Sequence, residues 1–467
     1  MPARSQSGTQ PVIPLLDATA GDVTEPLRRL RNKLAPTGDI VSPRGRELTQ
    51  QVFGEPLTPQ QVVDRICGEV QRRGDEAVFD YSRRLDGHDA AATGLRVPAD
   101  QLRKSHAGCD RAMLECIRRI RNRIADFQQA ILHRDVTTTP SPGVRLTQRY
   151  TPLARVGLCV PGGAAAYPSS LLMTAVPAQA AGVQSIAVVA PPTRLGAFNP
   201  LIQAICWELG IDELYAVGGA QAVAAMAYGT QSLRAVDKIV GPGNLFVALA
   251  KRHVYGHVDI DSIAGPSEVI VVADETTPPH WAAADMLSQA EHSPGSAVLV
   301  TWDAGTVHAI ADELARQLAA LDRRDLTAQS LLDYGALVLV KDREQTLAVI
   351  EEMAPEHLHL AFEGAAEMAS RVRNAGATFV GPYTPVALGD YAAGPSHVLP
   401  TGGTARWASG LSSNHFLRSN SVIEFDQAAL QAIAPDVSAL ATCEGLTAHR
   451  ESVEVRLRGR AGTETKK

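Results

Sequence analysis

Short apolar runs alternate with segments of helical periodicity from about residue 156 to about residue 380, and this alternation restricts the fold more than any other feature of the chain. Such alternation is typical of a parallel sheet with helices on both faces, which is a doubly wound α/β fold. Two groups of runs can be drawn, at about 156–265 and about 266–410, and each predicts a Rossmann-like unit. The predicted strands are Val156–Val160, Ser185–Val189, Glu213–Val217, Lys238–Val240, Glu268–Ala273, Ala297–Thr301, Ala336–Val340 and Thr378–Val380.

The flanking segments predict smaller parts. Residues 1–50 are rich in Pro, Arg, Ser and Gly, and we expect a loose N-terminal arm with one short helix near Glu25–Leu34. Residues 51–155, which begin with helical apolar spacing, are assigned together with 266–410 to the larger Rossmann-like domain. Residues 156–265 are expected to form the second Rossmann-like domain, and residues 411–467 a small C-terminal tail domain.

Length, charge and cysteine usage exclude several classes. A chain of 467 residues exceeds one ordinary core, so that several domains are expected. The net charge is −6 without a long basic block, so neither nucleic acid nor a membrane is an expected partner. The six cysteines contain no CxxC pair, and the N-terminus has no hydrophobic signal core, which together indicate the cytoplasm. The most apolar stretch, 171–192, is interrupted by Pro177 and predicts a helix followed by a buried strand.

Three predicted strands run into glycine-rich turns that open helices, at Val160–Gly163, Val217–Gln221 and Val240–Asn244. Glycine lets the backbone turn sharply and lets a ligand approach the free N–H groups of the following helix. Ordinary tight turns have the same composition, but three of them in one unit favour a nucleotide or substrate cleft. The standard GxGxxG fingerprint is absent.

Two motifs contain candidate ligands or catalysts on predicted regular structure. On a helix, Asp285, Gln289 and His292 are spaced i, i+4 and i+7 and share a face, and imidazole and amide or carboxylate oxygens are zinc ligands. A solvated polar face has the same spacing. At a strand entry or loop, Glu356 and His357 can point into one cleft, where Glu activates water and His moves a proton. The alternative is an exposed strand edge.

Two further motifs contain acid and histidine pairs. Asp390 and His397 lie in a segment so rich in Gly and Pro that we expect a loop rather than a helix. Glu444 and His449 are five residues apart, which on a helix separates them by about 140°, so a shared site requires a turn at Gly445. Structural roles in turns remain open for both pairs.

Taken together, these segments resemble the histidinol dehydrogenase family. The resemblance covers about residues 150–450, and the matching stretches follow the family's order. They are VGLCVPGG, VGGAQAVAAMAYGT, DKIVGPGN, AGPSEVIVVAD, DMLSQAEHSP, APEHLHL, LGDYAAGPSHVLPTGGTAR, SGLS and EGLTAH.

The resemblance implies a role for each candidate residue. It implies that Glu356 and His357 form the catalytic pair. A zinc ion would be held by Gln289, His292, Asp390 and His449. Substrate contacts would come from these ligands, His357, and the further residues Ser267, His397 and Glu444. NAD would contact Gln221 and Asn244, together with Cys159, which stands where the family usually has tyrosine.

The resemblance also implies a reaction and an assembly. The alcohol L-histidinol would be oxidised to L-histidine in two hydride steps through a bound aldehyde, with two NAD consumed. The tail would complete the partner's site in an obligate homodimer. Three other interpretations remain: a dehydrogenase of the same family for another polar alcohol or diol, a zinc hydrolase, and a non-catalytic scaffold.

Overall fold

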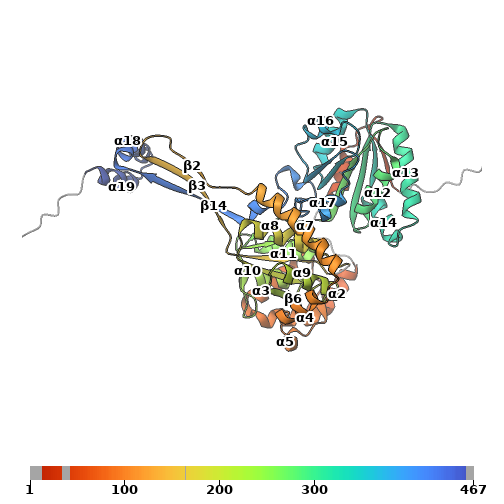
Figure 1. Cartoon of the computed structure of the whole chain (residues 1–467), viewed down its shortest axis with the longest axis horizontal. Helices are drawn as coiled ribbons and strands as arrows, with labels where there is room; N and C mark the ends of the chain where they lie inside the picture. Colours follow the sequence, from red (N-terminus) through yellow and green to blue (C-terminus); the bar gives the residue numbers. More distant parts are fainter. Residues whose placement is uncertain (1–12, 34–42, 163–164, 459–467) are drawn as a thin grey trace, which may run out of the picture. The chain divides into compact units, whose positions relative to one another are not determined.

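The structure of the chain, a computed structural model, describes residues 13–33, 43–162 and 165–458. This part forms two compact units, the first within residues 1–131 and 153–416 and the second within 132–152 and 417–467. The first unit contains two parallel sheets and the second a small antiparallel sheet (Figure 1). None of the helices in the described ranges combines the length and the apolar character that a membrane crossing requires.

The larger sheet has six parallel strands in the order β1-β11-β10-β9-β12-β13. Apolar clusters lie on both of its faces, one formed with α12, α13 and α14 and the other with α1, α15 and α16. The strands are β1 (Leu15–Asp17), β9 (Ser267–Val272), β10 (Gly295–Thr301), β11 (Ala336–Leu339), β12 (His357–Leu360) and β13 (Ala377–Val380). The helices are α1 (Thr24–Lys33), α12 (Pro279–Ala290), α13 (Ala304–Leu318), α14 (Arg324–Tyr334), α15 (Arg343–Met353) and α16 (Ala365–Ala369).

The register of this sheet brings the starts of three strands together. Ser267 of β9 pairs with Gly295 of β10, and Val269 pairs with His357 of β12. Because the strands are parallel, the residues that begin β9, β10 and β12 lie along one edge, which we call the amino edge of the larger sheet.

The smaller sheet has five parallel strands in the order β6-β5-β4-β7-β8. The strand order reverses between β4 and β7, and doubly wound proteins bind ligands beyond the carboxyl ends of strands at such a switch point. The strands are β4 (Arg155–Cys159), β5 (Ser185–Ala190), β6 (Glu213–Ala216), β7 (Lys238–Val240) and β8 (Asp259–Ile260). The intervening helices are α8 (Pro168–Ala181), α9 (Pro200–Glu208), α10 (Gly219–Tyr228) and α11 (Leu245–Val254).

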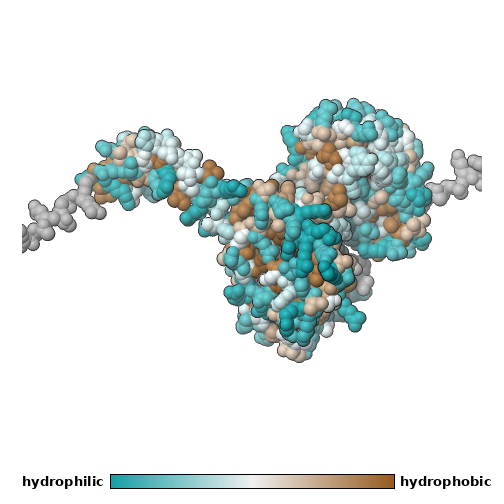
Figure 2. Space-filling view, in the orientation of Figure 1, coloured by the Kyte–Doolittle hydropathy of each residue, from teal (hydrophilic) through white to brown (hydrophobic). Residues whose placement is uncertain are grey.

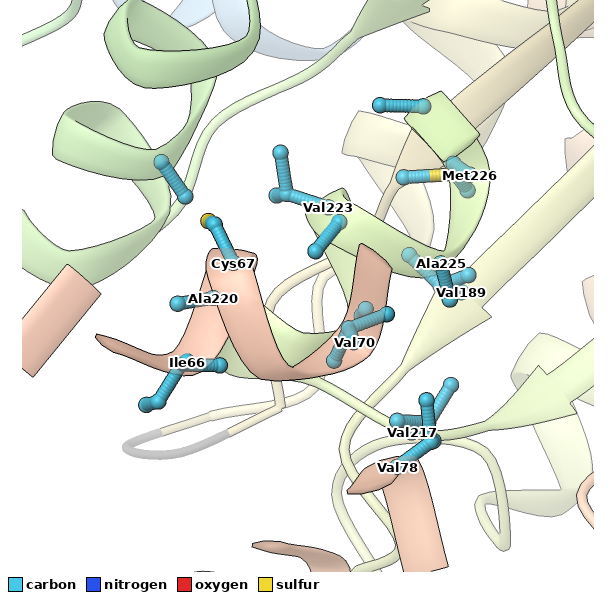
Figure 3. Close-up of a cluster of buried hydrophobic side chains, with 14 of the residues drawn as sticks. Ile66, Cys67, Val70, Val78, Val189, Val217, Ala220, Val223, Ala225 and Met226 are labelled. Carbon is cyan, nitrogen blue, oxygen red and sulfur yellow. The ribbon is translucent and has the colours of Figure 1, made fainter. Parts of the chain in front are cut away.

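The predicted α/β class is confirmed, and each predicted strand is present with its ends shifted by at most two residues. The assignment of the N-terminal helices to the larger sheet is wrong, because they pack on the smaller one. In α3, the side chains of Ile66, Cys67 and Val70 belong to one apolar cluster with Ala220 and Val223 of α10 (Figure 3). These helices are α2 (Pro43–Phe53), α3 (Pro59–Arg73), α4 (Asp75–Asp86), α5 (Ala90–Thr93), α6 (Ala99–Ala107) and α7 (Arg111–Ala130). Helical periodicity identifies a buried face but not the sheet that covers it.

Residues 13–33 of the predicted N-terminal arm form regular structure, whereas residues 1–12 and 34–42 lie outside the described residues. The predicted helix is present as α1, whose Leu27 and Leu30 are buried against the larger sheet. Ahead of it, β1 pairs in parallel with β11 and extends the sheet by one strand. A three-residue strand is too short to show an alternating pattern.

The second unit differs from the predicted tail because it includes residues 132–152. Its antiparallel sheet has the order β14-β3-β2, and β14 and β3 pair along their whole length. Its elements are β2 (Val136–Thr138), β3 (Val144–Pro152), β14 (Leu417–Phe425), α18 (Gln427–Cys443) and α19 (Thr447–Leu457). The pairing joins segments more than two hundred residues apart, a separation that local sequence patterns do not reveal.

Glu208, the last residue of α9, contacts basic side chains of α6 and α7 and so links these two helices to α9. Hydrophilic side chains gather over α7 (Figure 2), and two of them, Arg118 and Arg121, reach the Glu208 carboxylate at 2.8 and 3.2 Å. His106 of α6 contacts the same carboxylate at 2.8 Å. The hydrogen bond from Arg118 is the main cause that lowers the pKa of Glu208 to about 2. The hydrogen bond with His106 and the charges of both arginines act in the same direction, whereas burial acts to raise the pKa.

This lowered pKa predicts a pH-dependent stability. The folded pKa lies below the ordinary value of 4.5, so the ion pairs stabilise the fold above about pH 4.5, and the contribution is lost as the pH falls through about 2. We expect Glu208→Gln to lower the free energy of unfolding at neutral pH. As the pH falls, the free energies of unfolding of the variant and the wild type should approach each other. Denaturant unfolding at a series of pH values measures this, with the exposed Glu363→Gln as control. A difference that does not depend on pH would contradict the role of Glu208.

Candidate active site

A cavity of about 430 Å³ lies between the amino edge of the larger sheet and the carboxyl ends of strands in the smaller sheet. The larger sheet contributes Ser267, Glu356 and His357, and the smaller one contributes the Gly241–Asn244 turn. The connection from β8 to β9 crosses between the sheets and lines the cavity with residues such as Ser262. This volume is of the size that small-molecule sites occupy.

The Glu356 carboxylate is held at the amino edge by neighbours on β9. Its Oε2 accepts hydrogen bonds from the Ser267 hydroxyl at 2.6 Å and from the Glu268 backbone N–H at 2.9 Å. Burial raises the pKa of Glu356 above its usual range, while the positive charge of His357 and the Ser267 hydrogen bond oppose this shift. The result is a buried carboxyl group with a defined orientation toward the cavity.

His357 is oriented by the same strand. Its Nδ1 lies 3.1 Å from the Glu268 carbonyl, which only accepts, so Nδ1 carries the hydrogen and Nε2 is left for proton transfer. Nε2 lies 3.6 Å from Asp390 Oδ1. Burial alone would lower the pKa of His357, but the carboxylates of Glu356 and Asp390 outweigh it and raise the pKa to about 9.

Asp390 lies on a short helix, α17 (Ala387–Tyr391), so the prediction of a loop at this residue is wrong. Gly389 allows this helix to pack closely on the Phe379 ring, because a side chain there would collide with it. The Asp390 carbonyl accepts from His397 Nδ1 at 2.9 Å. Burial acts to raise the pKa of Asp390, but its ion pair with His357 outweighs burial and lowers it.

Two further ligand candidates lie at the end of α12. Asp285 and Gln289 are on the helix, whereas His292 lies in the turn after its last residue, so the prediction of one shared helical face is wrong for His292. The residue before Pro294 is disfavoured in a helix, which ends α12 here. His292 lines the cavity, and burial lowers its pKa, which favours the neutral imidazole that binds metals.

The donor set can be tested against a metal by its chemistry. Gln289 is 2% exposed, and its amide nitrogen is buried without a hydrogen-bond partner among the described residues. Such a buried, unsatisfied donor is energetically costly. The cost would be relieved if the amide were reoriented so that its oxygen bound a cation. His292 and Asp390 line the larger cavity, whereas Gln289 is not among its lining residues; an imidazole, a carboxylate and an amide oxygen are donor types that suit zinc. Within the described ranges, no group of three or more His, Cys, Asp or Glu side chains is arranged so that it could hold a metal ion.

Glu444 and His449 belong to the second unit. α18 ends at Cys443, Gly445 takes a positive φ of 72°, and α19 begins at Thr447, so the predicted turn at Gly445 is present. Both side chains are exposed. Their participation in a site with residues of the first unit remains a prediction.

The second cavity, of about 240 Å³, lies at the switch point of the smaller sheet. All three glycine-rich turns line it, including Gly162, Gly218 and Gly243. Cys159 and Asn244 line it as well, and Asn244 also caps α11 by accepting from the Val247 N–H at 3.2 Å. The turns that the sequence singled out therefore form one cleft, and this cleft shares the Pro242–Asn244 wall with the larger cavity.

Gln221 is not among the described residues that line this cleft. Its amide donates to Asp86 Oδ2 at 3.1 Å, behind the turn, where burial raises the pKa of Asp86 to about 6. The side chain thus supports the turn in this structure rather than facing a ligand. Cys159 lines the cleft as a buried thiol, and burial raises its pKa to about 12, so that it presents a neutral, compact surface.

Several residues of the site were missed by sequence reasoning. Glu268 lies behind Glu356, where its Oε1 accepts from the N–H groups of Glu356 and Gly402 at 3.2 and 2.9 Å. A glutamate inside an apolar strand run is the signal that could have revealed it. His359, two residues after His357, is buried, and its Nδ1 lies 2.8 Å from Asp285 Oδ2.

A glycine-lined cleft at a switch point, beside a buried acid–base cluster, is the arrangement of a doubly wound α/β enzyme that binds its ligand at the carboxyl ends of the strands. The chain belongs to the histidinol dehydrogenase family, whose profile matches residues 55–457.

Individual relatives agree along nearly the whole chain. A histidinol dehydrogenase of Rhodopirellula baltica is 59% identical over 440 residues, covering 94% of this chain and 96% of that protein. One of Moorella thermoacetica is 47% identical over 416 residues, covering 88% of this chain and 98% of that protein. The crystal structure of histidinol dehydrogenase from Elizabethkingia anophelis matches with a TM-score of 0.86 at 30% identity, covering 97% of this chain and 99% of that one.

The buried hydrogen bonds of Glu268 predict its effect on stability. Glu268→Ala removes the acceptor of two backbone N–H groups, and each unsatisfied buried group costs about 1–3 kcal/mol. Glu268→Gln retains an acceptor oxygen and should keep most of the wild-type stability. Urea unfolding of both variants measures the contrast. Equal losses in the two variants would show that the retained oxygen does not act as the acceptor of these N–H groups.

Proposed function

We propose that the chain catalyses the NAD-dependent, four-electron oxidation of L-histidinol to L-histidine. The observation that carries the proposal is the pair of adjoining cavities, one with Glu356 and His357 and one lined by glycine-rich turns, with a shared wall. The relatives named histidinol dehydrogenase support this substrate. A hydrolase would gain nothing from the glycine-lined cleft.

His357 is the residue proposed to move protons. Because Nδ1 donates to the Glu268 carbonyl, Nε2 takes the alcohol proton in the first step and a proton of the aldehyde hydrate in the second. Glu356 activates the water that adds to the aldehyde between these steps. Bound NAD would supply the hydride acceptor for each oxidation.

Gln289, His292 and Asp390 would hold a zinc ion, which supplies positive charge and open positions for the substrate's nitrogen atoms. Positive charge at Asp390 would also oppose the effect of the carboxylates on the pKa of His357. His449 is the proposed fourth ligand. Ser267, His397 and Glu444 are proposed substrate contacts together with these ligands and His357. Cys159, Gln221 and Asn244 are proposed on the NAD side, with Gln221 acting through its turn.

The C-terminal tail is proposed to complete the site of a second copy in a homodimer. In α18, Ile433, Val437 and Leu440 follow helical spacing and are 40%, 37% and 63% exposed. An exposed apolar stripe of this kind fits a protein interface. The exposed Glu444 and His449 directly follow this stripe.

The proposed function predicts the stoichiometry of the reaction. Each L-histidinol consumed should yield two NADH, with little free aldehyde, because the intermediate stays bound. NADH absorbance together with product analysis on zinc-loaded protein measures this ratio. A ratio of one with accumulating aldehyde would mean that the second oxidation is missing, and a lack of NADH would refute the dehydrogenase proposal. Faster turnover of another polar alcohol would favour the alternative substrate within the family.

The roles of the catalytic pair can be separated by substrate. Glu356→Gln should spare the alcohol step more than the aldehyde step, whereas His357→Asn should damage both, and a positioned acid or base contributes about a hundredfold to ten-thousandfold. Rates with L-histidinol and L-histidinal, supplied separately, measure the contrast. Equal losses on both substrates for Glu356→Gln, in folded and zinc-loaded protein, would refute the water-activating role.

The metal assignment predicts that chelation abolishes activity and that zinc restores it. His292→Ala should lower the zinc content per chain because it removes an imidazole ligand, while the exposed His308→Ala should leave it unchanged. Metal analysis of purified protein measures both variants. Full activity in a metal-free preparation would refute the zinc proposal.

A further inference from the structure

The turn formed by residues 241–244 is the wall between the two cavities. Gly241 lines the larger cavity, and Pro242, Gly243 and Asn244 line both. The turn leaves β7 and opens α11, so its backbone decides where Asn244 and the first N–H groups of α11 are placed. A ligand in the cleft would therefore be positioned against the substrate by this short segment.

The turn has little conformational preference of its own. Gly241 adopts a φ of 105°, and a side chain there would collide with the Cys159 carbonyl at the end of β4. Glycine makes the conformation possible but does not select it, because glycine has the largest conformational freedom of any residue. Contacts with neighbouring groups must hold the turn in place.

A buried ion pair supplies these contacts. Lys251 Nζ, on α11, donates to the Gly241 carbonyl at 3.1 Å and forms an ion pair with Asp261 Oδ1. Asp261 Oδ2 accepts from the Gly241 N–H at 2.7 Å. Both backbone groups of Gly241 are therefore held by the two members of the pair, whose side chains are only 2% and 4% exposed.

The topology explains why the pair meets here. β7 and β8 are parallel neighbours, with Ile239 opposite Ile260, so the residues that follow them emerge at the same edge of the sheet. Asp261 follows β8 directly, beside Gly241. The Asp261 Oδ1 atom also accepts from the Ser262 N–H at 2.6 Å, so both carboxylate oxygens are engaged by protein donors. Asp261 also lines the larger cavity, but because both carboxylate oxygens are engaged by protein donors, it is placed to act through the turn.

We infer that Lys251 and Asp261 are positioning residues that hold the 241–244 turn in the geometry that binds the dinucleotide and set the cofactor cleft against the substrate cavity. The inference rests on the proposed use of NAD. The alternative is an ion pair that serves stability alone, because removing one partner of a buried pair leaves an uncompensated charge. The two roles differ in whether loss of the pair changes cofactor affinity beyond its effect on stability.

The same sheet offers a matched control. Arg155 and Glu213 form an ion pair at 2.6 Å with side chains 9% and 14% exposed, at the opposite ends of the strands, where β4 and β6 begin. Arg155→Met removes the charge of a largely buried basic residue at the end of the strands away from the turn. Lys251→Met removes the charge of a buried basic residue beside the turn. Asp261→Asn is a near-isosteric second variant, in which the amide N–H₂ would face the Gly241 N–H or replace an acceptor of Lys251.

The test measures NADH binding by fluorescence titration and stability by urea unfolding for the purified wild type, Lys251→Met, Asp261→Asn and Arg155→Met. We expect the first two variants to weaken NADH binding by about tenfold or more, equivalent to about 1.4 kcal/mol per tenfold change. Arg155→Met should lose stability while keeping wild-type NADH affinity. Steady-state rates should show the KM for NAD rising more than the KM for L-histidinol.

The opposing outcomes are distinct. Wild-type affinity in Lys251→Met and Asp261→Asn, or an equal loss of affinity in Arg155→Met, would overturn the positioning role and leave the proposed function intact. Failure of both variants to fold while Arg155→Met folds would overturn it as well, because the pair would then be part of the folding core. No NADH binding by the wild type would overturn the proposed cofactor together with the inference.

Discussion

The parallel pairing of β9 with β12 is the constraint on which the acid–base site depends. It places the start of one strand, Ser267 and Glu268, beside the start of the other, Glu356 and His357. The backbone of β9 then donates to the Glu356 carboxylate and accepts from the His357 imidazole, so the register of the sheet orients both catalytic candidates. A shift of one residue would turn both side chains to the opposite face.

The two sheets contribute opposite edges to the cavities. The smaller sheet follows the usual rule for doubly wound folds, with its glycine turns gathered at the carboxyl ends of β4, β6 and β7. The larger sheet departs from the rule, because its chemistry lies where β9, β10 and β12 begin. The connection from β8 to β9 joins these edges within one cavity, which allows one sheet to present a cleft and the other to present acid and base groups.

The order of elements in the doubly wound sheets could be predicted from the sequence, because apolar runs and glycine turns are local signals. The helices and strands against which each element packs or pairs were harder to predict. The periodicity of α3 shows a buried face but not that Val223 covers it, and the pairing of β3 with β14 depends on segments far apart in the chain. The Gly and Pro content around Asp390 predicts a loop, whereas in the structure Gly389 allows α17 to pack on Phe379.

The sequence by itself determined the fold class, the glycine turns and the family, because strand periodicity, turn chemistry and motif order are properties of short segments. It also identified the candidate acid and base, Glu356 and His357, and the chemistry expected of them. Only the tertiary structure decided which groups surround them. Glu268 behind the pair, Asp86 behind Gln221 and the Lys251–Asp261 pair at the turn arise from strand register and helix packing. These contacts join distant residues, and no local pattern encodes them.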